Sequence, residues 1–599
     1  MSGYIAITVQ GNERRVAWKH SFREAGKSTP CSSALHLGVL AADGTELLRC
    51  RRRRPEDFTP EILDALSRKG IALGERMADV VGRKPTVLTR ITVRELASSQ
   101  VVMVGVYRVL RHLAVESGLL SSLVSAFGDD AEAVFALACH RLDSRQGVYL
   151  AQDWAEQTPF RNAVVHLSPS SAGRLLAGVA GRRLAFFKAW YSACGRPQTL
   201  IEDSTHFCTR AGDRSRREAE EHGWEHHQED GLRQINVMSL VARPSRLPVM
   251  CRAYFGSIND ISTFTETSEE MEVVGEGVSR EYISDCGYFS DFNLGMMLRN
   301  GDDFTIEAKW NNRTEKIWEE HRSSLEGRGE TVRHGGLAYR HEPCEYVLPP
   351  AHCPAPRNSV AGHIYYCALE HSRVWNALRV ELDDCKEKFS RYAFRDAAQA
   401  REWLDTCTGG LGKYLQVVGD GDFSLRTDDA RVDADTEKAG FHIILSTVSG
   451  RDAAETMETI HGRDPVEKLW HEMKSELGAR RLGTKMDDTT QGEVFIVWCA
   501  AILRRLLAGQ MKECKVEMTM AELLLALRKV TVLVTERRVS ATTLTRKSKD
   551  AIAGLRLEKL FSEFEGELAS TVEARTKREN PNTRHPGRPP KYKLKEDAK

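Results

Sequence analysis

The first 55 residues alternate apolar and polar positions in the manner of short strands. Apolar side chains recur at positions 5, 7 and 9 and again at 35–40, with Gly11 and Gly44 where turns are expected. A period of two is typical of half-buried antiparallel strands. We therefore predict an N-terminal β-hairpin module. Its far end carries arginines at 49 and 51–54, a run that suits a polyanion but is also common on a solvated edge.

From residue 59 the spacing becomes helical. The sequence Thr59-Pro60-Glu61 is a strong helix start. Apolar residues then recur every three or four positions over residues 62–80, 101–117, 130–141 and 145–156. A further helix opens at 168–171. The pattern predicts a mainly helical region, which suits DNA binding but is also ordinary scaffolding.

The pattern changes again at residue 199, where TLIEDSTHF predicts a short strand that delivers Asp203 at its end. Further strands are predicted at 234–242, 247–255, 281–289 and 303–310, with a helix at 291–301. Residues 313–450 mix strand-like pieces with turns and indicate an inserted domain. Helices return at 452–507, 520–534 and 548–568. The whole chain is therefore expected to be a mixed α/β protein.

Composition narrows the class of protein. The 599 residues include 85 Lys and Arg, 84 Asp and Glu, and 41% hydrophobic residues, which predicts several folded domains rather than a disordered chain. The longest apolar run, residues 494–503, is about half of the ~20 residues that cross a bilayer. The N-terminus has no apolar signal core. We expect a protein that stays inside the cell and does not span a membrane.

Fourteen cysteines occur without any Cys-x-x-Cys pair, so no disulfide framework or zinc ribbon is indicated. The nearest approach to a metal cluster is a group of five residues, His341, Cys344, His352, Cys353 and His363. Its spacing matches no regular zinc finger. The alternatives are an irregular zinc site and ordinary loop residues beside several prolines.

The C-terminal residues 571–599 hold nine basic and four acidic residues together with four prolines. Such a stretch cannot build a core, and we predict a disordered basic arm. Within it, the sequence around Arg588 resembles an AT-hook, whose extended Gly-Arg-Pro core enters a narrow minor groove. Pro-rich basic ends are also common linkers.

Two acidic residues are expected at the ends of separate strands, Asp203 in IEDSTHF and Asp285 in ISDCGYFS. If those strands are neighbours, the carboxylates share one edge of a sheet and form oxygen ligands for a hard divalent cation such as magnesium. An isolated Asp at a strand end is more often a turn or cap residue. A third carboxylate would favour the metal site.

The segment HGRDPVEKLWHEMKSEL supplies a candidate for that third carboxylate. Val466, Leu469, Trp470, Met473 and Leu477 form one apolar stripe of a helix. Glu467 borders that stripe and Lys474 follows nearly two turns later on the same face. Further basic residues, Arg480, Arg481 and Lys485, indicate a path for phosphate groups. Alternatively, Asp464, Pro465 and Glu467 form a capping box that needs no chemistry.

Taken together, these segments resemble the DDE transposases of bacterial and archaeal insertion sequences. One subgroup carries the signature Tyr, two residues, Arg, three residues, Glu, six residues, Lys. Arg463, Glu467 and Lys474 fall at that spacing, while Ile460 replaces the tyrosine. The flanks of both aspartates, the stretch GSINDISTF, Gln234 and the stretch GFHIILST also resemble the family. The similarity covers roughly residues 100–560.

The resemblance implies an RNase H-like catalytic core, in which Asp203, Asp285 and Glu467 bind two Mg²⁺ or Mn²⁺ ions. It implies cleavage and strand transfer of double-stranded DNA at the terminal inverted repeats of a mobile element, by a dimer or larger oligomer associated with the nucleoid. Five basic residues would contact DNA, Arg463, Lys474, Arg480, Arg481 and Arg588. The 182 positions between Asp285 and Glu467, against 82 between the aspartates, leave room for an insertion domain.

The resulting domain prediction has six parts: a β-hairpin module (1–58), a helical DNA-binding region (59–190), the first part of the core (191–312), the insertion domain (313–450), the second part of the core with C-terminal helices (451–570), and the basic tail (571–599). Two other functions stay open at this level. One is a catalytically idle DNA-binding descendant of a transposase, and the other is a nuclease of the same fold that hydrolyses without joining.

Overall fold

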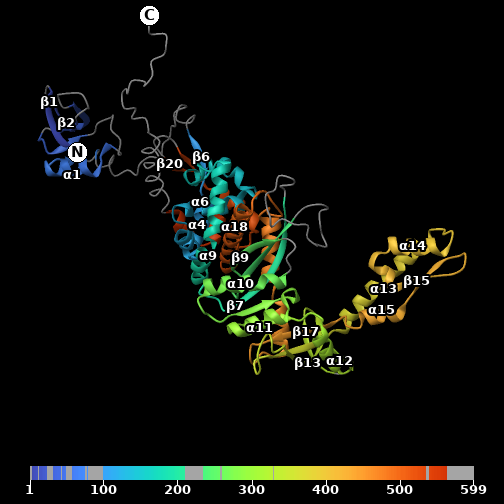
Figure 1. The fold of residues 1–599 in the computed structure, drawn as a ribbon. Coiled ribbons are helices and arrows are strands. Elements are labelled where there is room, and N and C mark those ends of the chain that lie inside the picture. Colours follow the sequence, from blue (N-terminus) through green and yellow to red (C-terminus); the bar gives the residue numbers. More distant parts are fainter. Residues whose placement is uncertain are drawn as a thin grey trace, which may run out of the picture. The chain divides into compact units, whose positions relative to one another are not determined.

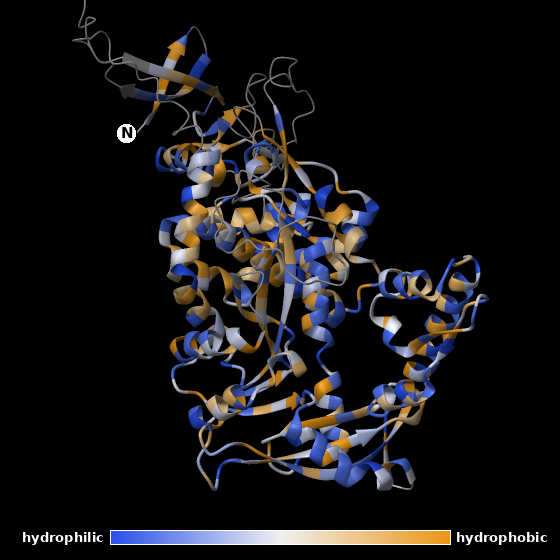
Figure 2. Ribbon diagram, turned by 45° about the vertical axis from the view of Figure 1, so that its right-hand side comes forward, coloured by the Kyte–Doolittle hydropathy of each residue, from blue (hydrophilic) through white to orange (hydrophobic). Residues whose placement is uncertain are grey.

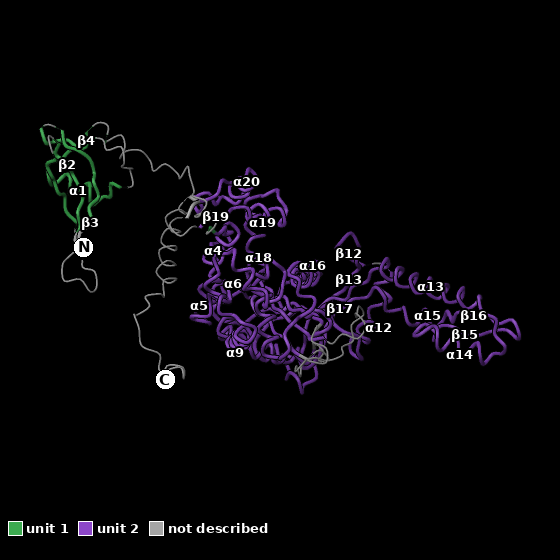
Figure 3. The backbone as a smooth tube through the Cα atoms, turned by 90° about the horizontal axis from the view of Figure 1, so that it is seen from above, with its two compact units in different colours: residues 1–99 green, residues 100–599 purple. Residues whose placement is uncertain are grey.

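The computed structural model describes residues 3–562, apart from 11–12, 23–30, 42, 49–56, 75–76, 78–98, 210–233, 256–259, 328 and 535–538. The chain divides into two compact units, residues 1–99 and 100–599 (Figure 3). The arginine run at 49–54 and the tail with Arg588 both lie wholly outside the described residues.

The N-terminal unit is a five-stranded sheet covered by one helix. Its elements are β1 (Tyr4–Gln10), β2 (Glu13–Phe22), β3 (Cys31–Leu40), β4 (Glu46–Leu48), β5 (Ala72–Leu73) and α1 (Pro60–Arg68). The strands lie in chain order and only the last pair is parallel. Ile62 and Leu66 of α1 pack with Val16 and Leu37 of the sheet. The helix start at Pro60 is confirmed, but α1 belongs with this sheet rather than with the helical region, because its apolar side buries the sheet.

The larger unit contains a helical layer built around one long helix, α18 (Asp487–Glu513). The other helices of the layer are α4 (Gly105–Glu116), α5 (Leu119–Phe127), α6 (Ala131–Ser144), α7 (Ala151–Ala155), α8 (Arg161–Val164), α9 (Pro169–Ala193), α19 (Met520–Arg528), α20 (Arg546–Gly554) and α21 (Glu558–Ser562). Helices α4, α6 and α9 contact α18. The start of α9 is confirmed, since the Ser168 hydroxyl caps the amide of Ser171.

Helix α18 is apolar because it lies inside the protein. Among the described helices, it alone is long and apolar enough to cross a bilayer by length and composition. Its residues 494–503 are all buried, and an aromatic cluster of Phe127, Phe186, Phe187, Phe495 and Trp498 joins it to α5 and α9. Figure 2 shows that the helices of this unit carry both hydrophobic and hydrophilic residues. A helix that is apolar all round is expected at the centre of such a layer.

Two predicted helices begin or end in strands. Residues 101–103 belong to β6 (Gln100–Met103), and residues 531–534 form β19 (Thr531–Val534). These strands pair with each other and with β20 (Val539–Ala541) in a small antiparallel sheet. The local pattern predicts helix for these residues because they adjoin helices. Only the long-range pairing of residues 101 and 533 selects the strand conformation that their β-branched side chains favour.

A large mixed sheet forms the centre of the unit (Figure 1). Its first five strands are β7 (Thr199–Thr209), β8 (Gln234–Arg243), β9 (Pro248–Phe255), β10 (Glu281–Ser284) and β11 (Asp303–Glu307). They lie in the order β9, β8, β7, β10, β11. The first three form an antiparallel meander, whereas β10 and β11 run parallel to β7. Helices α10 (Asp260–Gly275) and α11 (Asp291–Asn300) make the connections that parallel strands require.

Helices cover both faces of this sheet. Trp498 of α18 donates a hydrogen bond of 3.2 Å to the hydroxyl of Ser239, which is paired with Asp203 across β7 and β8. Helix α18 therefore lies on the face that carries Asp203. On the other face, Phe264 of α10 packs edge to face against Tyr282 of β10.

The predicted insertion domain is only partly separate. Strands β17 (Phe441–Ser446), β14 (Ser359–Tyr366), β13 (Leu337–Val347) and β12 (Glu330–His334) extend the main sheet from the edge of β11, beside α12 (Asn312–Gly327). These strands satisfy the hydrogen-bonding groups that the edge of β11 would otherwise expose.

Residues 368–436 alone form an independent body, which we call the arm (Figure 1). Its elements are α13 (Ala368–Ser390), α14 (Ala397–Cys407), β15 (Leu415–Val418), β16 (Ser424–Thr427) and α15 (Asp429–Thr436). Leu382, Phe389, Leu404 and Val432 form its own core.

The predicted helical stretch 452–507 is broken into pieces. Helix α16 (Ala453–His461) ends before α17 (Asp464–His471), which carries Pro465 in its first turn and continues into a π-helical turn, Glu472–Glu476. A short strand, β18 (Arg481–Leu482), then pairs with the far end of β7 before α18 begins. Proline cannot continue the backbone hydrogen bonds of a preceding helix, which explains the break at residues 462–463.

Candidate active site

Asp203 and Asp285 stand side by side on neighbouring strands. Ile201 of β7 is paired with Ile283 of β10, and the two aspartates follow two residues later, Asp203 within β7 and Asp285 directly after the end of β10. They therefore point to the same face at the usual strand separation of about 4.8 Å. Asp203 lies in the middle of β7, so its predicted place at a strand end is wrong. The polar residues after it stay in the strand because they pair with the apolar strand β8 along their whole length.

The electrostatics of the pair follow from this proximity. Burial, together with the charge of Asp285, raises the pKa of Asp203 to about 7. Asp285 also caps a turn, since its Oδ1 accepts a hydrogen bond of 2.7 Å from the amide of Gly287. Of the two roles that the sequence left open for Asp285, this hydrogen bond confirms the one in a turn. Two close carboxylates with one raised pKa favour a cation between them, which would relieve their repulsion.

Helix α17 lies over the aspartates and contacts both. The indole Nε1 of Trp470 donates a hydrogen bond of 2.9 Å to Oδ2 of Asp203. At the other end of the helix, Nη1 of Arg463 lies 3.5 Å from Oδ2 of Asp285. The Arg463 Nε also donates to the carbonyl of Ile460, at 3.2 Å, which fixes the start of the side chain.

Helix α17 is itself held in place by α18. Nη2 of Arg505 donates to the carbonyl of Pro465 at 2.6 Å, and its Nε lies 2.8 Å from the carboxylate of Glu472. Val466 and Leu469 are fully buried beneath the helix. These contacts fix both ends of α17 above β7.

Helical spacing places Glu467 on the same side of α17 as the two residues that contact the aspartates. It follows Arg463 by four residues and precedes Trp470 by three, and such positions share one face of a helix. Its side chain is exposed. The capping box is absent, because Arg463 is the N-cap residue without a side-chain cap and Asp464 instead bonds Lys468 at 2.6 Å. Among the described residues, no three His, Cys, Asp or Glu side chains are already grouped to hold a metal ion.

Basic side chains continue from the aspartates along β7. The ammonium group of Lys474 lies 5.7 Å from the ring centroid of Phe207, four residues beyond Asp203. Strand β18 then places Arg481 beside Cys208, and Arg480 is exposed next to it. Arg481 and Lys485 line a cavity of about 750 Å³ together with Arg145. Three of the five predicted DNA-binding residues, Lys474, Arg480 and Arg481, therefore lie beside β7, and a fourth, Arg463, contacts Asp285.

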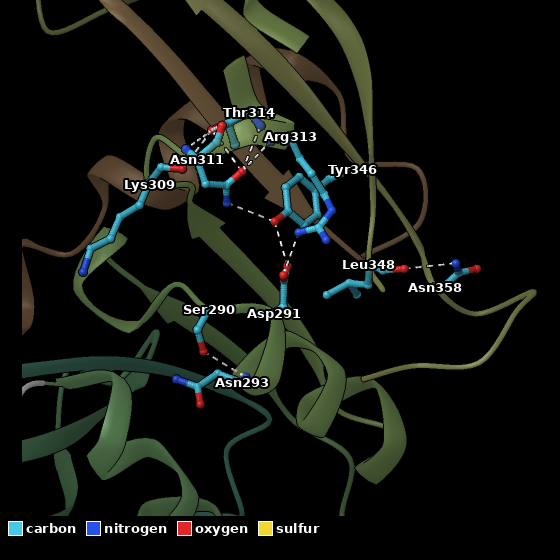
Figure 4. Close-up of polar contacts among 10 residues, drawn as sticks. All are labelled: Ser290, Asp291, Asn293, Lys309, Asn311, Arg313, Thr314, Tyr346, Leu348 and Asn358. Atoms are coloured by element: carbon cyan, nitrogen blue, oxygen red, sulfur yellow. Dashed lines mark hydrogen bonds and ion pairs between the residues drawn. The ribbon is translucent and has the colours of Figure 1, made fainter. Parts of the chain in front are cut away.

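The loops that follow β10 and β11 are joined by a polar network (Figure 4). Asp291, at the start of α11, accepts hydrogen bonds of 2.7 Å from Arg313 and from the hydroxyl of Tyr346. Asn311 also donates to Tyr346, at 3.2 Å, and Lys309 donates to the carbonyl of Gly287 at 3.3 Å. These bonds fix the positions of the strand ends that carry Asp285 and Glu307.

Three polar residues that the sequence did not single out lie next to this site. Nδ1 of His442 lies 2.8 Å from Oε1 of Glu307, and its Nε2 lies 3.0 Å from Oε2 of Glu370. Burial lowers the pKa of His442, but the two carboxylates outweigh burial and raise that pKa to about 9. Glu307 ends β11, whereas the predicted strand continued to residue 310, so the prediction did not place it at a strand end. No local signal joins it to His442, 135 residues away.

The His and Cys residues between 341 and 363 do not gather. His341 and Cys344 lie on β13 and His363 on β14, whereas His352 and Cys353 lie in the turn between these strands. The rings of His341 and His363 have centroids 5.8 Å apart. The described residues show no set of three ligands here.

No family model and no curated protein matches this chain. Among solved structures, it is similar to a piggyBac transposase synaptic complex with hairpin DNA, with a TM-score of 0.32 and 10% sequence identity. The superposition covers 78% of this chain and 79% of that chain. A TM-score this low does not establish a common fold.

Proposed function

We propose that this protein is a DDE-type DNA transposase that cleaves and joins DNA strands at a metal site formed by Asp203, Asp285 and Glu467. The observation that carries the proposal is the parallel pairing of Ile201 with Ile283, from which Asp203 and Asp285 each follow by two residues. The strand order β9, β8, β7, β10, β11 supports an RNase H-like core, because a three-stranded meander is followed there by two strands parallel to its first strand.

The residues fit a hard divalent cation. Carboxylate oxygens are the ligands that Mg²⁺ and Mn²⁺ prefer, and Asp203 and Asp285 supply them from a rigid sheet. Glu467, carried on the helix above, would complete the set. A bound pair of such ions activates a water or a 3′-hydroxyl group and stabilises the charge on the phosphate under attack.

The protein's own residues would orient that reaction. Trp470 holds Oδ2 of Asp203, so the carboxylate keeps one orientation. Arg463 balances the charge of Asp285 and lies where a phosphate oxygen would approach the pair. Lys474, Arg480 and Arg481 would then contact the backbone phosphates of DNA along β7, which positions the strand without reading its sequence.

DNA binding is supported by the local clustering of basic residues rather than by the net charge of the chain. The chain is nearly neutral, with a formal charge of +1, so a polyanion needs a local basic surface. The basic residues beside β7 provide one. We further propose that the substrates are the terminal inverted repeats of a mobile element of the insertion-sequence type and its target DNA, bound by a dimer or larger oligomer.

A catalytically idle DNA-binding protein is the second candidate. It is favoured by one observation, that Glu467 is exposed and not grouped with the aspartates into a three-ligand site among the described residues. A nuclease that hydrolyses without joining would use the same residues and differs only in its product.

The test uses the coding region with its native flanking DNA on a supercoiled plasmid. Mg²⁺-dependent cleavage by the full-length protein is compared with that by Asp203→Asn, with Asp129→Asn as a control in an exposed turn. We expect cleavage at the flanks by the wild type and the control alone, followed by joined products. Cleavage without joining would indicate the nuclease. DNA binding without cleavage by any of the three would indicate the idle protein.

A further inference from the structure

A third carboxylate stands in line with the two aspartates. Ser284, the last residue of β10, is paired with Ile306 of β11, so Asp285, directly after β10, follows in line with Glu307, the last residue of β11. Asp203 is level with Asp285 on the other side. Glu307 therefore points to the same face of the sheet as the proposed metal ligands.

Glu307 is held from behind by a chain of hydrogen bonds. His442 joins it to Glu370, at 2.8 and 3.0 Å. The hydroxyl of Tyr339 in turn donates 2.8 Å to the other oxygen of Glu370. A carboxylate oriented through a histidine and a second carboxylate has little freedom to rotate, as is common for residues that support a functional site.

Arg463 interacts electrostatically with all three of these carboxylates. Its guanidinium group contacts Asp285 at 3.5 Å. Its charge helps to lower the pKa of Glu307 and opposes the rise in the pKa of Asp203. The Arg463 side chain is only 20% exposed. An attraction to Glu307 therefore acts in a partly desolvated place, where charges interact more strongly than in water.

We propose that Glu307 is a further positioning residue of this active site, which, held by His442, directs the guanidinium group of Arg463 toward the reacting phosphate. The proposal rests on the proposed function for the identity of the phosphate. Glu307 would act through Arg463, without touching the substrate or a metal ion.

A purely structural role is the rival explanation. Glu370 lies in the first turn of α13, and His442 is the second residue of β17. These are the two places where the chain enters and leaves the arm. The same hydrogen bonds could therefore serve only to fix the root of the arm, in which case their loss would lower stability without any dependence on Arg463.

A double-mutant cycle separates the two roles. Full-length wild type, Glu307→Gln, Arg463→Gln and the double variant are compared for kcat and KM on DNA with native ends. We expect each single substitution to lower kcat about tenfold, within the range of interactions between residues of one network. The double variant should be no slower than Arg463→Gln. Additive losses would overturn the proposal.

A second readout needs no DNA and no catalysis. Phenylglyoxal modification of each arginine is followed by mass spectrometry in the free protein. We expect Glu307→Gln to speed modification of Arg463 severalfold and to leave Arg313, paired with Asp291, unchanged. An unchanged rate at Arg463 would overturn the proposal even if the protein were idle. Absence of cleavage by the wild type would instead overturn the proposed function.

Two further variants complete the test. Glu437→Gln removes a contact with Arg322 at 3.4 Å near the same root of the arm and should alter neither readout. If Glu307→Gln does not fold, His442→Gln releases the same carboxylate and should show the same dependence on Arg463. Loss of Mn²⁺ affinity in Glu307→Gln, measured by electron paramagnetic resonance, would make Glu307 a metal ligand and would also overturn the positioning role.

Discussion

The indole of Trp470 donates a hydrogen bond of 2.9 Å to Oδ2 of Asp203, which ties helix α17 to the central strand of the sheet. This contact joins residues 267 positions apart in the chain. It shows why the helix that carries Glu467 belongs over the two aspartates, because the apolar stripe of α17 alone fixes which side is buried but not which strand lies beneath.

Replacing Trp470 by Phe should weaken both folding and catalysis. Phenylalanine keeps most of the packing but leaves Asp203 without this donor, at a cost of about 1–2 kcal/mol. The lost hydrogen bond lowers the pKa of Asp203 in the wild type, so that pKa should rise further from about 7. Urea unfolding and Mg²⁺ titration of cleavage at pH 7 would measure both effects.

Trp375→Phe is the matched control, since Trp375 donates a comparable bond of 3.0 Å to Asp433 within the arm. It should leave the Mg²⁺ requirement unchanged. If Trp470→Phe cleaves DNA as well as the wild type, the bond to Asp203 has no role in the site.

Replacing Glu467 by Gln should abolish cleavage without a loss of stability. The side chain is exposed, and surface substitutions usually change the free energy of unfolding by no more than about 0.5 kcal/mol. The substitution removes the negative charge of a proposed metal ligand. Mn²⁺ affinity should therefore fall, while DNA affinity should be unchanged. Glu513→Gln, at the exposed end of α18, serves as the control. Full cleavage by Glu467→Gln would remove this residue from the site.

The pH dependence of stability should reveal His442. Its pKa is raised from the usual value of about 6.5 to about 9, so the folded protein holds this proton more tightly than the unfolded chain. The stabilisation is therefore complete below about pH 6.5 and is lost as the pH rises through about 9. The stability difference between the wild type and His442→Gln, measured by urea unfolding, should shrink over that interval.

Other ionisable groups also face His442. Each of them changes the stability with pH either in the same direction as His442 or at a lower pH. They are Glu307, Glu370, Tyr339 and His461. The pKa values of both glutamates are lowered, so their contribution is present above their unfolded value of about 4.3 and is lost as the pH falls below it. A stability difference that stays constant from pH 6 to pH 10 would contradict a protonated His442.

Deleting residues 571–599 should weaken DNA binding and flatten its dependence on salt. Each phosphate contact that is lost reduces the slope of log K against log salt by about 0.9, because fewer counterions are released. Titrations at several salt concentrations would compare the full chain with the truncated one. An equal slope for both proteins would show that the tail, including Arg588, does not contact DNA.

Much of the local structure follows from the sequence alone. Pro60 and Ser168 mark the starts of α1 and α9 because proline and serine suit the first turn and the N-cap whatever the rest of the chain does. The strands predicted at 234–242, 247–255 and 303–310 are confirmed as β8, β9 and β11. The two aspartates and the order in which Glu467 follows them were also visible, since acidic residues next to buried strands are a local pattern.

What only the tertiary structure decided is which strands are neighbours. The parallel pairing of β10 with β7 brings Asp285 level with Asp203, and that of β11 with β10 adds Glu307 to the row. The edge of β11 likewise takes up β17 and β14, which makes part of the predicted insertion a continuation of the main sheet. Alternation along a strand sets the face on which a side chain lies, but hydrogen bonds between strands carry no local sequence signal. The residues of the candidate site can therefore be identified in the sequence, but their arrangement in space depends on pairings between distant segments.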